Sequence, residues 1–422
     1  MTVLSDLAAL IPDARDRLKG VARITPVELN QRLTEATGSE VWLKREDLQP
    51  VRSYKLRGAY NLISQLPPEA REAGVVCASA GNHGQGVAFA AATLGIGAGV
   101  YVPTTTPRQK RDRIQALGRG HVELVMEGST YDQASRAAAQ FAEHNGRILV
   151  PAFNDPRTAA GQGTAVAEAV EQLGFVPDVV VLPIGGGGLM SGAAAWLRTH
   201  HPQVRIVGVE PDGAPCVAAA ISAGRPFPLN NIDTFVDGAA VSLVGDYTFG
   251  VINEAKIELT RIPEGQVCSE MLAMYQTDGI IAEPAGALAA AALPTGGGGT
   301  RIHIPGGSRV LSIVSGGNND VARYADVVER SLLHEGRKHY FLVNFPQQPG
   351  ALRRFLDEVL GPDDDITYFE YVKRSSREVG PALVGVELSN PEDYRFLLAR
   401  ITECGMEVNE VDSTSPYFRF LV

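Results

Sequence analysis

The sequence predicts an α/β protein with parallel sheets, followed by a small α+β domain of the ferredoxin-like type. Short apolar strands alternate with amphipathic helices between about residues 75 and 210, which is typical of parallel sheets covered by helices on both faces. Near the carboxyl end the order becomes βαββαβ within about 75 residues, which is typical of the ferredoxin-like unit. A chain of 422 residues exceeds one typical domain, so two or three domains are expected.

The first pattern consists of apolar strands that are each followed by a helix with one apolar face. The strands are expected at residues 75–80, 98–103, 121–126, 147–153, 178–184 and 205–211, and the helices at 81–95, 106–118, 130–144, 158–174 and 189–200. In parallel sheets of this kind, ligands bind beyond the carboxyl ends of the strands, where loops enter helices. Residues that directly follow these strands are therefore the first candidates for a site.

The second pattern follows a charged stretch at residues 329–339. Its strands are expected at 339–346, 365–374, 381–389 and 406–412, and its helices at 348–361 and 391–405. We therefore divide the chain into a first domain of residues 1–333 and a second, ferredoxin-like domain of residues 338–413.

The composition excludes several classes of partner. The hydrophobic content of 45% is that of an ordinary globular protein, and the net charge of −10 gives no general attraction to nucleic acid or anionic membranes. No apolar stretch approaches the roughly 18 residues of a spanning helix, and the amino-terminal segment lacks the apolar core of a signal peptide. The four cysteines are widely scattered, so we expect them to be buried and reduced in a cytoplasmic protein.

A lysine with apolar neighbours stands out in the segment SYKLRGAYN, residues 53–61. Lys55 lies between Tyr54 and Leu56, and glycine follows at position 58. One interpretation is a lysine at a helix edge whose stem covers apolar surface. The other is a lysine held in a pocket to form a covalent bond with a cofactor aldehyde.

A glycine run between a buried strand and a helix predicts a phosphate site. It consists of Gly185, Gly186, Gly187 and Gly188, and the helix begins near Leu189. Glycines allow close approach of the backbone, and the helix start adds partial positive charge, so a single phosphate monoester fits best. The run matches neither a dinucleotide fingerprint nor a Walker loop, and a flexible turn is the alternative.

Two further strand ends carry small polar residues. In the first, Ser79, Ala80, Gly81, Asn82 and His83 precede a helix, where backbone N–H groups would bind a carboxylate and Asn82 would donate to a ring hydroxyl. The second is SIVSGGNND, residues 312–320, with Ser315 at the turn. The alternative in both places is a side chain that only caps a helix.

One ligand, pyridoxal 5'-phosphate, fits the lysine and all three turns. The glycine run would hold its phosphate, and Lys55 would bind its aldehyde as a Schiff base. Asn82 would contact its ring hydroxyl, and Ser315 its pyridine nitrogen.

These motifs resemble those of the threonine dehydratases, which belong to the tryptophan-synthase-β-like pyridoxal-phosphate enzymes. The resemblance is carried, in the family's order between about residues 15 and 325, by LKREDLQPVRSYKLRGAYN, SAGNHGQGVA, PIGGGGL, EPAGA and SGGN. It implies a two-lobed catalytic domain, with a smaller lobe at about 50–155 inserted in the larger one. It also implies that Lys55, Asn82, the segment Gly185–Leu189 and Ser315 contact the cofactor, and that Tyr54 packs beside the ring where the family often has Phe.

The reaction that the resemblance implies is deamination of L-threonine to 2-oxobutanoate and ammonia, and also of L-serine to pyruvate. Lys55 would remove the α-proton. A catabolic dehydratase and a serine racemase are alternatives, but such racemases carry a second serine at the position of Ala80. Relatives also bind a cation near Glu210, and because Cys216 replaces their aspartate we expect no metal. A catalytically silent amino-acid sensor is an alternative from a different class.

The tail, with HYFLVNFPQQPGALRRFLDEV, resembles a single ACT-like regulatory domain of the biosynthetic form of the family. The resemblance implies feedback inhibition by isoleucine in the first step of isoleucine biosynthesis, with valine as an opposing ligand. It also implies a homo-oligomer, either a tetramer or a dimer.

Overall fold

The computed structural model describes residues 2–294, 302–371, 378–412 and 418. It divides into two compact units. The first comprises Met1–Glu264 and Ala273–Asn319, and the second comprises Gly265–Leu272 and Asp320–Val422. Helix α14 (Tyr324–His334) thus belongs to the second unit, whereas the sequence-based division placed residues up to 333 in the catalytic domain. The boundary of the catalytic function therefore stays a prediction.

The larger sheet of the first unit has six strands in the order β1-β2-β10-β7-β8-β9. Their bounds are Val27–Leu29 (β1), Glu40–Arg45 (β2), Val179–Pro183 (β7), Arg205–Pro211 (β8), Glu258–Ile262 (β9) and Arg309–Val314 (β10). Only β1 runs antiparallel to its neighbour. The late strand β10 lies between β2 and β7, so segments from both ends of the unit meet at the centre of the sheet.

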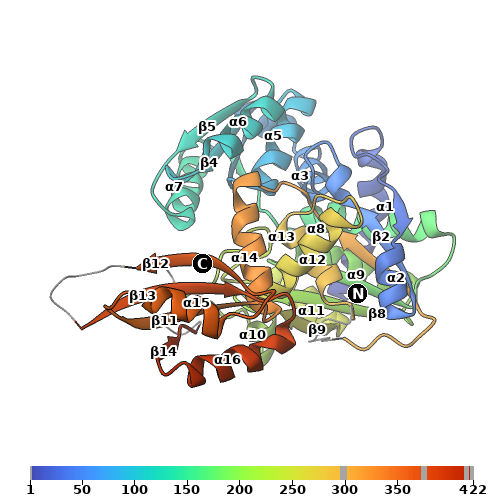
Figure 1. Ribbon diagram of the computed structural model, residues 1–422. Helices are drawn as coiled ribbons and strands as arrows, with labels where there is room; N and C mark the ends of the chain where they lie inside the picture. Colours follow the sequence, from blue (N-terminus) through green and yellow to red (C-terminus); the bar gives the residue numbers. More distant parts are fainter. Residues whose placement is uncertain (1, 295–301, 372–377, 413–417, 419–422) are drawn as a thin grey trace. The chain divides into compact units, whose positions relative to one another are not determined.

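The smaller sheet has four parallel strands in the order β5-β4-β3-β6. Their bounds are Val75–Ala78 (β3), Ala98–Val102 (β4), Val122–Met126 (β5) and Ile148–Leu149 (β6). Helix α7 (Tyr131–His144) covers one face, and α3 (Lys55–Ile63), α5 (Asn82–Leu94) and α6 (Arg108–Gly118) cover the other (Figure 1). The mainly parallel α/β architecture predicted from the sequence is confirmed.

The remaining helices of the first unit lie around the two sheets. They are α1 (Val3–Leu18), α2 (Gln31–Thr37), α4 (Pro68–Ala73), α8 (Pro156–Leu173), α9 (Gly188–His200), α10 (Cys216–Ala223), α11 (Asp246–Ala255) and α13 (Pro284–Ala291), with a short 3₁₀ turn η1 (Glu46–Leu48). Helix α8 begins where the side chain of Asp155 accepts a hydrogen bond from the N–H of Arg157, and it ends at Gly174 in the left-handed conformation. Asp155 and Gly174 thus fix the two ends of the helix.

The second unit is a four-stranded antiparallel sheet in the order β12-β13-β11-β14. Its strands are β11 (Lys338–Pro346), β12 (Asp365–Tyr371), β13 (Val379–Glu387) and β14 (Glu407–Glu410), and its helices are α14, α15 (Ala351–Val359) and α16 (Tyr394–Glu403), with 3₁₀ turns η2 (Val321–Arg323) and η3 (Pro391–Asp393). Helix α12 (Glu264–Gln276) contributes residues 265–272. The predicted ferredoxin-like order is confirmed, and residues 372–374 of one predicted strand lie outside the described residues.

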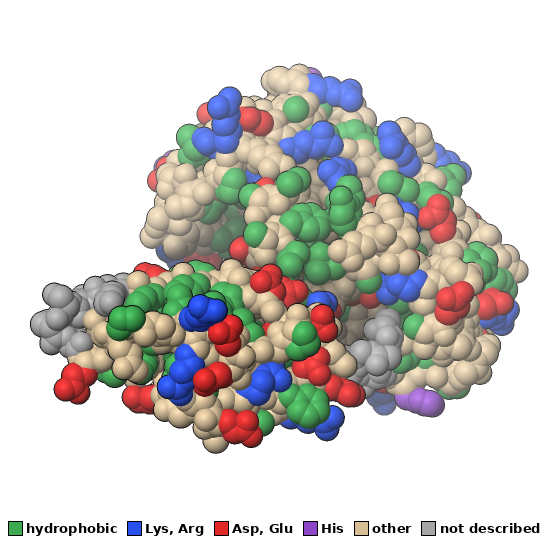
Figure 2. Space-filling view, in the orientation of Figure 1, with side chains coloured by type: hydrophobic (Ala, Val, Ile, Leu, Met, Phe, Trp, Pro, Cys, Tyr) green, Lys and Arg blue, Asp and Glu red, His purple; other side chains and the backbone are tan. Residues whose placement is uncertain are grey.

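All four cysteines, Cys77, Cys216, Cys268 and Cys404, are buried, and none of them forms a disulfide bond. No helix among the described residues is long and apolar enough to cross a membrane. On the face that Figure 2 shows, acidic and basic side chains are interspersed.

Candidate active site

A cavity of about 870 Å³ in the first unit brings together segments that are far apart in the chain. It is lined by Tyr54, Lys55, residues 78–83, the glycine segment 185–189, Glu283 and Asn318, among others. The loops that follow β3 and β7 both reach it, as expected for the carboxyl ends of parallel strands. The residues predicted for the aldehyde, phosphate, ring hydroxyl and carboxylate sites therefore share one cavity.

Lys55 is the first residue of α3, and its amine lies in this cavity. Nζ donates to the carbonyl of Gly238 at 3.5 Å. Burial lowers the pKa of the amine, while the carboxylates of Glu283 and Asp237 oppose that shift. Tyr54 beside it packs against the core of the larger sheet, and burial raises the pKa of its phenol. Lys55 therefore lines a pocket, as the second interpretation of SYKLRGAYN expects, and its bond to a cofactor aldehyde stays a prediction.

The glycine segment forms a backbone cradle at the start of α9. Gly187 has φ of 91°, which favours glycine, and a Cβ added to Gly186 would lie 2.3 Å from the ring of Phe153. The first intrahelical bond runs from the N–H of Ser191 to the carbonyl of Gly187, so the preceding N–H groups have no partner within the helix. Such a helix start fits a phosphate group.

The loop after β3 ends in a second helix start. Helix α5 begins at Asn82 with no side-chain cap, so neither Ser79 nor Asn82 caps it. The first intrahelical bond is from Gln85 N–H to the carbonyl of Gly81, and Ser79 Oγ accepts a hydrogen bond from the N–H of Gly81 at 3.2 Å. The free N–H groups of the first turn fit a carboxylate.

His83 is a neutral, buried side chain. Its Nε2 lies 2.8 Å from the carbonyl of Val150, which makes Nε2–H the donor, and burial lowers the pKa of the ring to about 4. A ring with this pKa is a weak base near neutral pH. In the proposed carboxylate site, His83 therefore takes part through its backbone N–H rather than through its ring.

Ser315 lies at the carboxyl end of β10 and is buried, but it is not among the residues that line the cavity. Its hydroxyl donates to the carbonyl of Ala285 at 3.0 Å, and its own carbonyl accepts a hydrogen bond from the N–H of Tyr54 at 3.2 Å. Ser315 is therefore tied to the start of α3, and its contact with a pyridine nitrogen stays a prediction.

Glu283 and Asn318 also line the cavity, and both bond to Asn82. Sequence reasoning assigned no role to either residue, although they lie in the EPAGA and SGGN motifs. The signal that could have found them was the motif match itself, because Glu283 and Asn82 are 201 residues apart and no local pattern connects them.

The carboxylate of Glu210 is bound by backbone N–H groups. Its carboxylate accepts hydrogen bonds from the N–H groups of Val217 (2.7 Å) and Ala218 (2.9 Å) at the start of α10, and burial raises its pKa to about 7. The Sγ of Cys216 donates to the carbonyl of Gly185 at 3.4 Å. Within the described residues no cluster of three or more His, Cys, Asp or Glu side chains is arranged to hold a metal ion.

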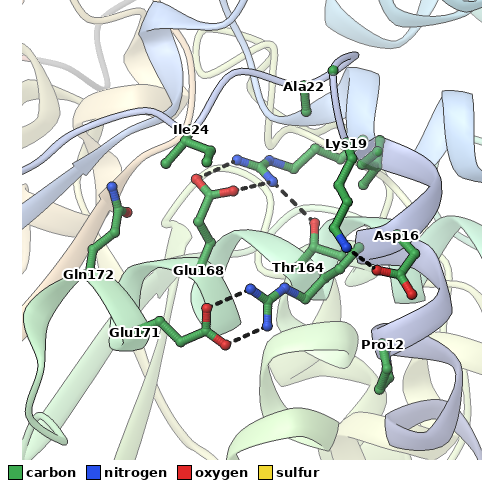
Figure 3. A pocket seen from close by; sticks show the side chains of 13 residues that line it. Pro12, Asp16, Lys19, Ala22, Ile24, Thr164, Glu168, Glu171 and Gln172 are labelled. Carbon is green, nitrogen blue, oxygen red and sulfur yellow. Dashed lines mark hydrogen bonds and ion pairs between the residues drawn. The ribbon is translucent and has the colours of Figure 1, made fainter.

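A second cavity, of about 630 Å³, lies beside α1 and α8 (Figure 3). Its cations are all paired: Lys19 with Asp16, Arg15 with Glu171, and Arg57 with Glu168. Arg57 also bonds to the buried Glu46, and Lys44 bonds to Glu168. Because these charges satisfy one another, we interpret the cluster as a support for α3, on which Lys55 lies.

Two family models match this chain. One describes a pyridoxal-phosphate dependent enzyme and covers residues 18–316, and the other describes the C-terminal regulatory domain of threonine dehydratase and covers residues 329–421. The chain is 52% identical to the biosynthetic L-threonine dehydratase IlvA of Mycobacterium tuberculosis over 98% of its own length and 95% of the relative. It is 44% identical to that of Bacillus subtilis over 97% of its length and 96% of the relative.

Two solved structures are also similar. The processed form of threonine deaminase isoform 2 from Solanum lycopersicum matches with a TM-score of 0.73 and 36% identity, over 78% of this chain and 89% of that one. Maize serine racemase matches with a TM-score of 0.70 and 29% identity, over 78% of this chain and 98% of that one.

Proposed function

The chain belongs to the biosynthetic L-threonine dehydratases, and we propose that the cavity around Lys55 is where it carries out the family's reaction. The protein is a pyridoxal-phosphate-dependent lyase that deaminates L-threonine to 2-oxobutanoate and ammonia in isoleucine biosynthesis. The observation that carries this conclusion is identity of 52% over nearly the whole of both chains, which includes the regulatory part. Release of 2-oxo acid from L-threonine by the purified holoenzyme, compared with L-serine, tests the activity and the proposed second substrate.

The residues present fit the cofactor. We assign its phosphate to the backbone N–H groups at Gly185–Leu189, its aldehyde to Lys55 and its ring hydroxyl to Asn82. When bound, the cofactor supplies an electron sink for the bond that breaks at the substrate's α-carbon. Lys55 is suited to remove the α-proton because burial favours its neutral amine, and a neutral amine is the basic form.

The loop Ser79–His83 is the proposed site of the substrate carboxylate. Ala80 lines the cavity with a methyl group and has no proton to exchange. A racemase needs a second base on the opposite face of the α-carbon, so this residue favours elimination over racemisation. Measurement of D-allothreonine and D-serine during turnover tests the distinction, and formation of either D-isomer at a rate near that of 2-oxo acid release would contradict it.

The C-terminal regulatory domain is proposed to respond to isoleucine as inhibitor, with valine as the opposing ligand. It lies after all of the proposed catalytic residues, so it acts by shifting a conformational or assembly equilibrium rather than by chemistry. Coupling of about 1–3 kcal/mol would change apparent threonine affinity by roughly 5- to 150-fold. Threonine saturation curves of the full chain, with and without each amino acid, measure the coupling, and curves that coincide would refute the assignment.

We also propose that the chain acts in the cytoplasm as a homo-oligomer, a dimer or a tetramer. Strand β12 lies at an edge of its sheet and exposes Tyr368 and Phe369, each more than a third accessible. An apolar edge strand is a common site for pairing with another chain. Light scattering gives the mass of the assembly, and a monomer at assay concentration would contradict the proposal.

A further inference from the structure

The side-chain amide of Asn82 is held at both of its ends. Its Nδ2 donates to Oε1 of Glu283 at 2.5 Å, and its Oδ1 accepts from Nδ2 of Asn318 at 2.7 Å. The triangle is closed because the backbone N–H of Asn318 donates to Oε2 of Glu283 at 3.2 Å. Asn82 begins α5 beside the smaller sheet, whereas Glu283 precedes α13 and Asn318 follows β10 in the larger one. The orientation of one amide is thus set by two distant segments.

The chemistry of the three groups allows only one orientation of the amide. A carboxylate is an acceptor, so it must face the NH₂ group of Asn82, and the NH₂ group of Asn318 must then face the Asn82 oxygen. An amide NH₂ has two hydrogens, and Glu283 takes one of them. The second hydrogen remains available for a ligand in the cavity.

Glu283 lies where its charge is costly. Glu283 is only 3% exposed. Burial raises the pKa of its carboxyl group to about 7, and the Asp237 carboxylate contributes to this rise. Lys55 and the N–H donors of Asn82 and Asn318 act in the opposite direction and lower the pKa. The charged groups that shift its pKa are Lys55 at the start of α3 and Asp237 in the loop before α11, and its own charge raises the pKa of the Tyr54 phenol. Burial thus moves the pKa of this carboxyl group toward neutral pH, and its hydrogen bond to Asn82 is strongest when it is charged.

We propose that Glu283 is a positioning residue: its carboxyl group fixes the Asn82 amide so that the second N–H of that amide points to the cofactor's ring hydroxyl, and it places an ionisable group beside that hydroxyl. This inference rests on the proposed place of the hydroxyl at Asn82. It explains why a buried carboxyl group with no part in the phosphate, aldehyde or carboxylate sites lines the same cavity.

The test compares Glu283→Gln with the matched control Glu210→Gln. Glu210 is also buried, also has a pKa raised to about 7 and also accepts backbone N–H groups, but it does not line the cavity. The absorption spectrum of the bound cofactor in wild type and in Glu210→Gln should change with pH around 7. In Glu283→Gln the part of that change centred near pH 7 should be lost.

A second variant separates charge from position. Glu283→Asp keeps an acid but withdraws it from Asn82, so the pH response should persist while cofactor affinity falls by about 5- to 150-fold, the effect of an unpaired buried amide. A wild-type pH response in Glu283→Gln, or wild-type cofactor affinity in Glu283→Asp, would overturn the inference. The variant Asn82→Ala distinguishes the two ways in which the inference can fail. If Asn82→Ala binds the cofactor with wild-type affinity, the proposed hydroxyl site at Asn82 is wrong. If Asn82→Ala binds the cofactor more weakly while the Glu283 variants behave like wild type, only the role of Glu283 is wrong.

Discussion

Gly186→Ala tests whether the phosphate cradle depends on close contact between the glycine segment and Phe153. A Cβ added at Gly186 would lie 2.3 Å from Cδ1 and Cε1 of the Phe153 ring and 2.4 Å from its Cγ. Carbon atoms in contact are normally about 3.5–4.0 Å apart, so the ring or the segment must move by more than about 1 Å. Both line the cavity, so either movement changes the shape of the proposed phosphate site.

The size of the effect follows from the overlap. Insertion of a methyl group into a packed site costs about 1–3 kcal/mol, and each 1.4 kcal/mol corresponds to a tenfold change in affinity. If the whole cost falls on the bound state, cofactor affinity decreases by about 5- to 150-fold. If part of the steric cost is already present in the apoprotein, that part lowers the free energy of unfolding of the apoprotein instead. The loss in cofactor-binding free energy and the loss in free energy of unfolding should then add up to about 1–3 kcal/mol.

The assay is a cofactor titration of the apoprotein, followed by absorbance, together with urea unfolding. Phe153→Leu shortens the side chain that the new methyl group meets, so a double-mutant cycle should show favourable coupling of about 1 kcal/mol or more. Gly250→Ala in α11 is the control, because apart from its chain neighbours and its own helix backbone no heavy atom lies within 4 Å of the added Cβ. Wild-type affinity and wild-type stability in Gly186→Ala would refute the steric reasoning.

Three further variants test other parts of the site. Lys55→Ala should abolish 2-oxo acid release and the yellow absorption band of lysine-bound cofactor while far-ultraviolet circular dichroism stays unchanged; near wild-type turnover would contradict the assignment. Ser315→Asp replaces a neutral hydroxyl at the proposed pyridine-nitrogen site with an acid, so elimination should slow and racemisation or transamination should rise, which chiral chromatography of the products measures; an unchanged product ratio would place Ser315 away from the nitrogen. Arg57→Met leaves the buried Glu46 and the partly exposed Glu168 without this cation, so the free energy of unfolding in urea should fall by about 3–5 kcal/mol, and Arg57→Lys should lose less. Equal stability of Arg57→Met and wild type would show that the ion cluster does not support α3.

Sequence reasoning worked best where a role depends on local order. The glycine segment was predicted to follow a buried strand and precede a helix, and β7 and α9 confirm that order, while the phosphate site there stays a prediction. The predicted strand at 147–153 is only Ile148–Leu149 in the structure, because element ends depend on pairing partners that a local pattern does not contain. The triangle of Asn82, Glu283 and Asn318 was missed for the same reason, since it forms only when β10 and α13 come to lie beside α5.

The four buried thiols give the protein an internal set of reporters for local opening. Cys77 lies in β3, Cys216 in α10, Cys268 in the part of α12 that belongs to the second unit, and Cys404 directly after α16. Burial raises the pKa of Cys77 and of Cys216 to about 12, so neither thiol reacts until its surroundings open. The rate at which each thiol is alkylated under native conditions therefore measures the opening of its own neighbourhood. Because no disulfide connects these regions, each of the four rates reports on one part of the molecule without any engineered label.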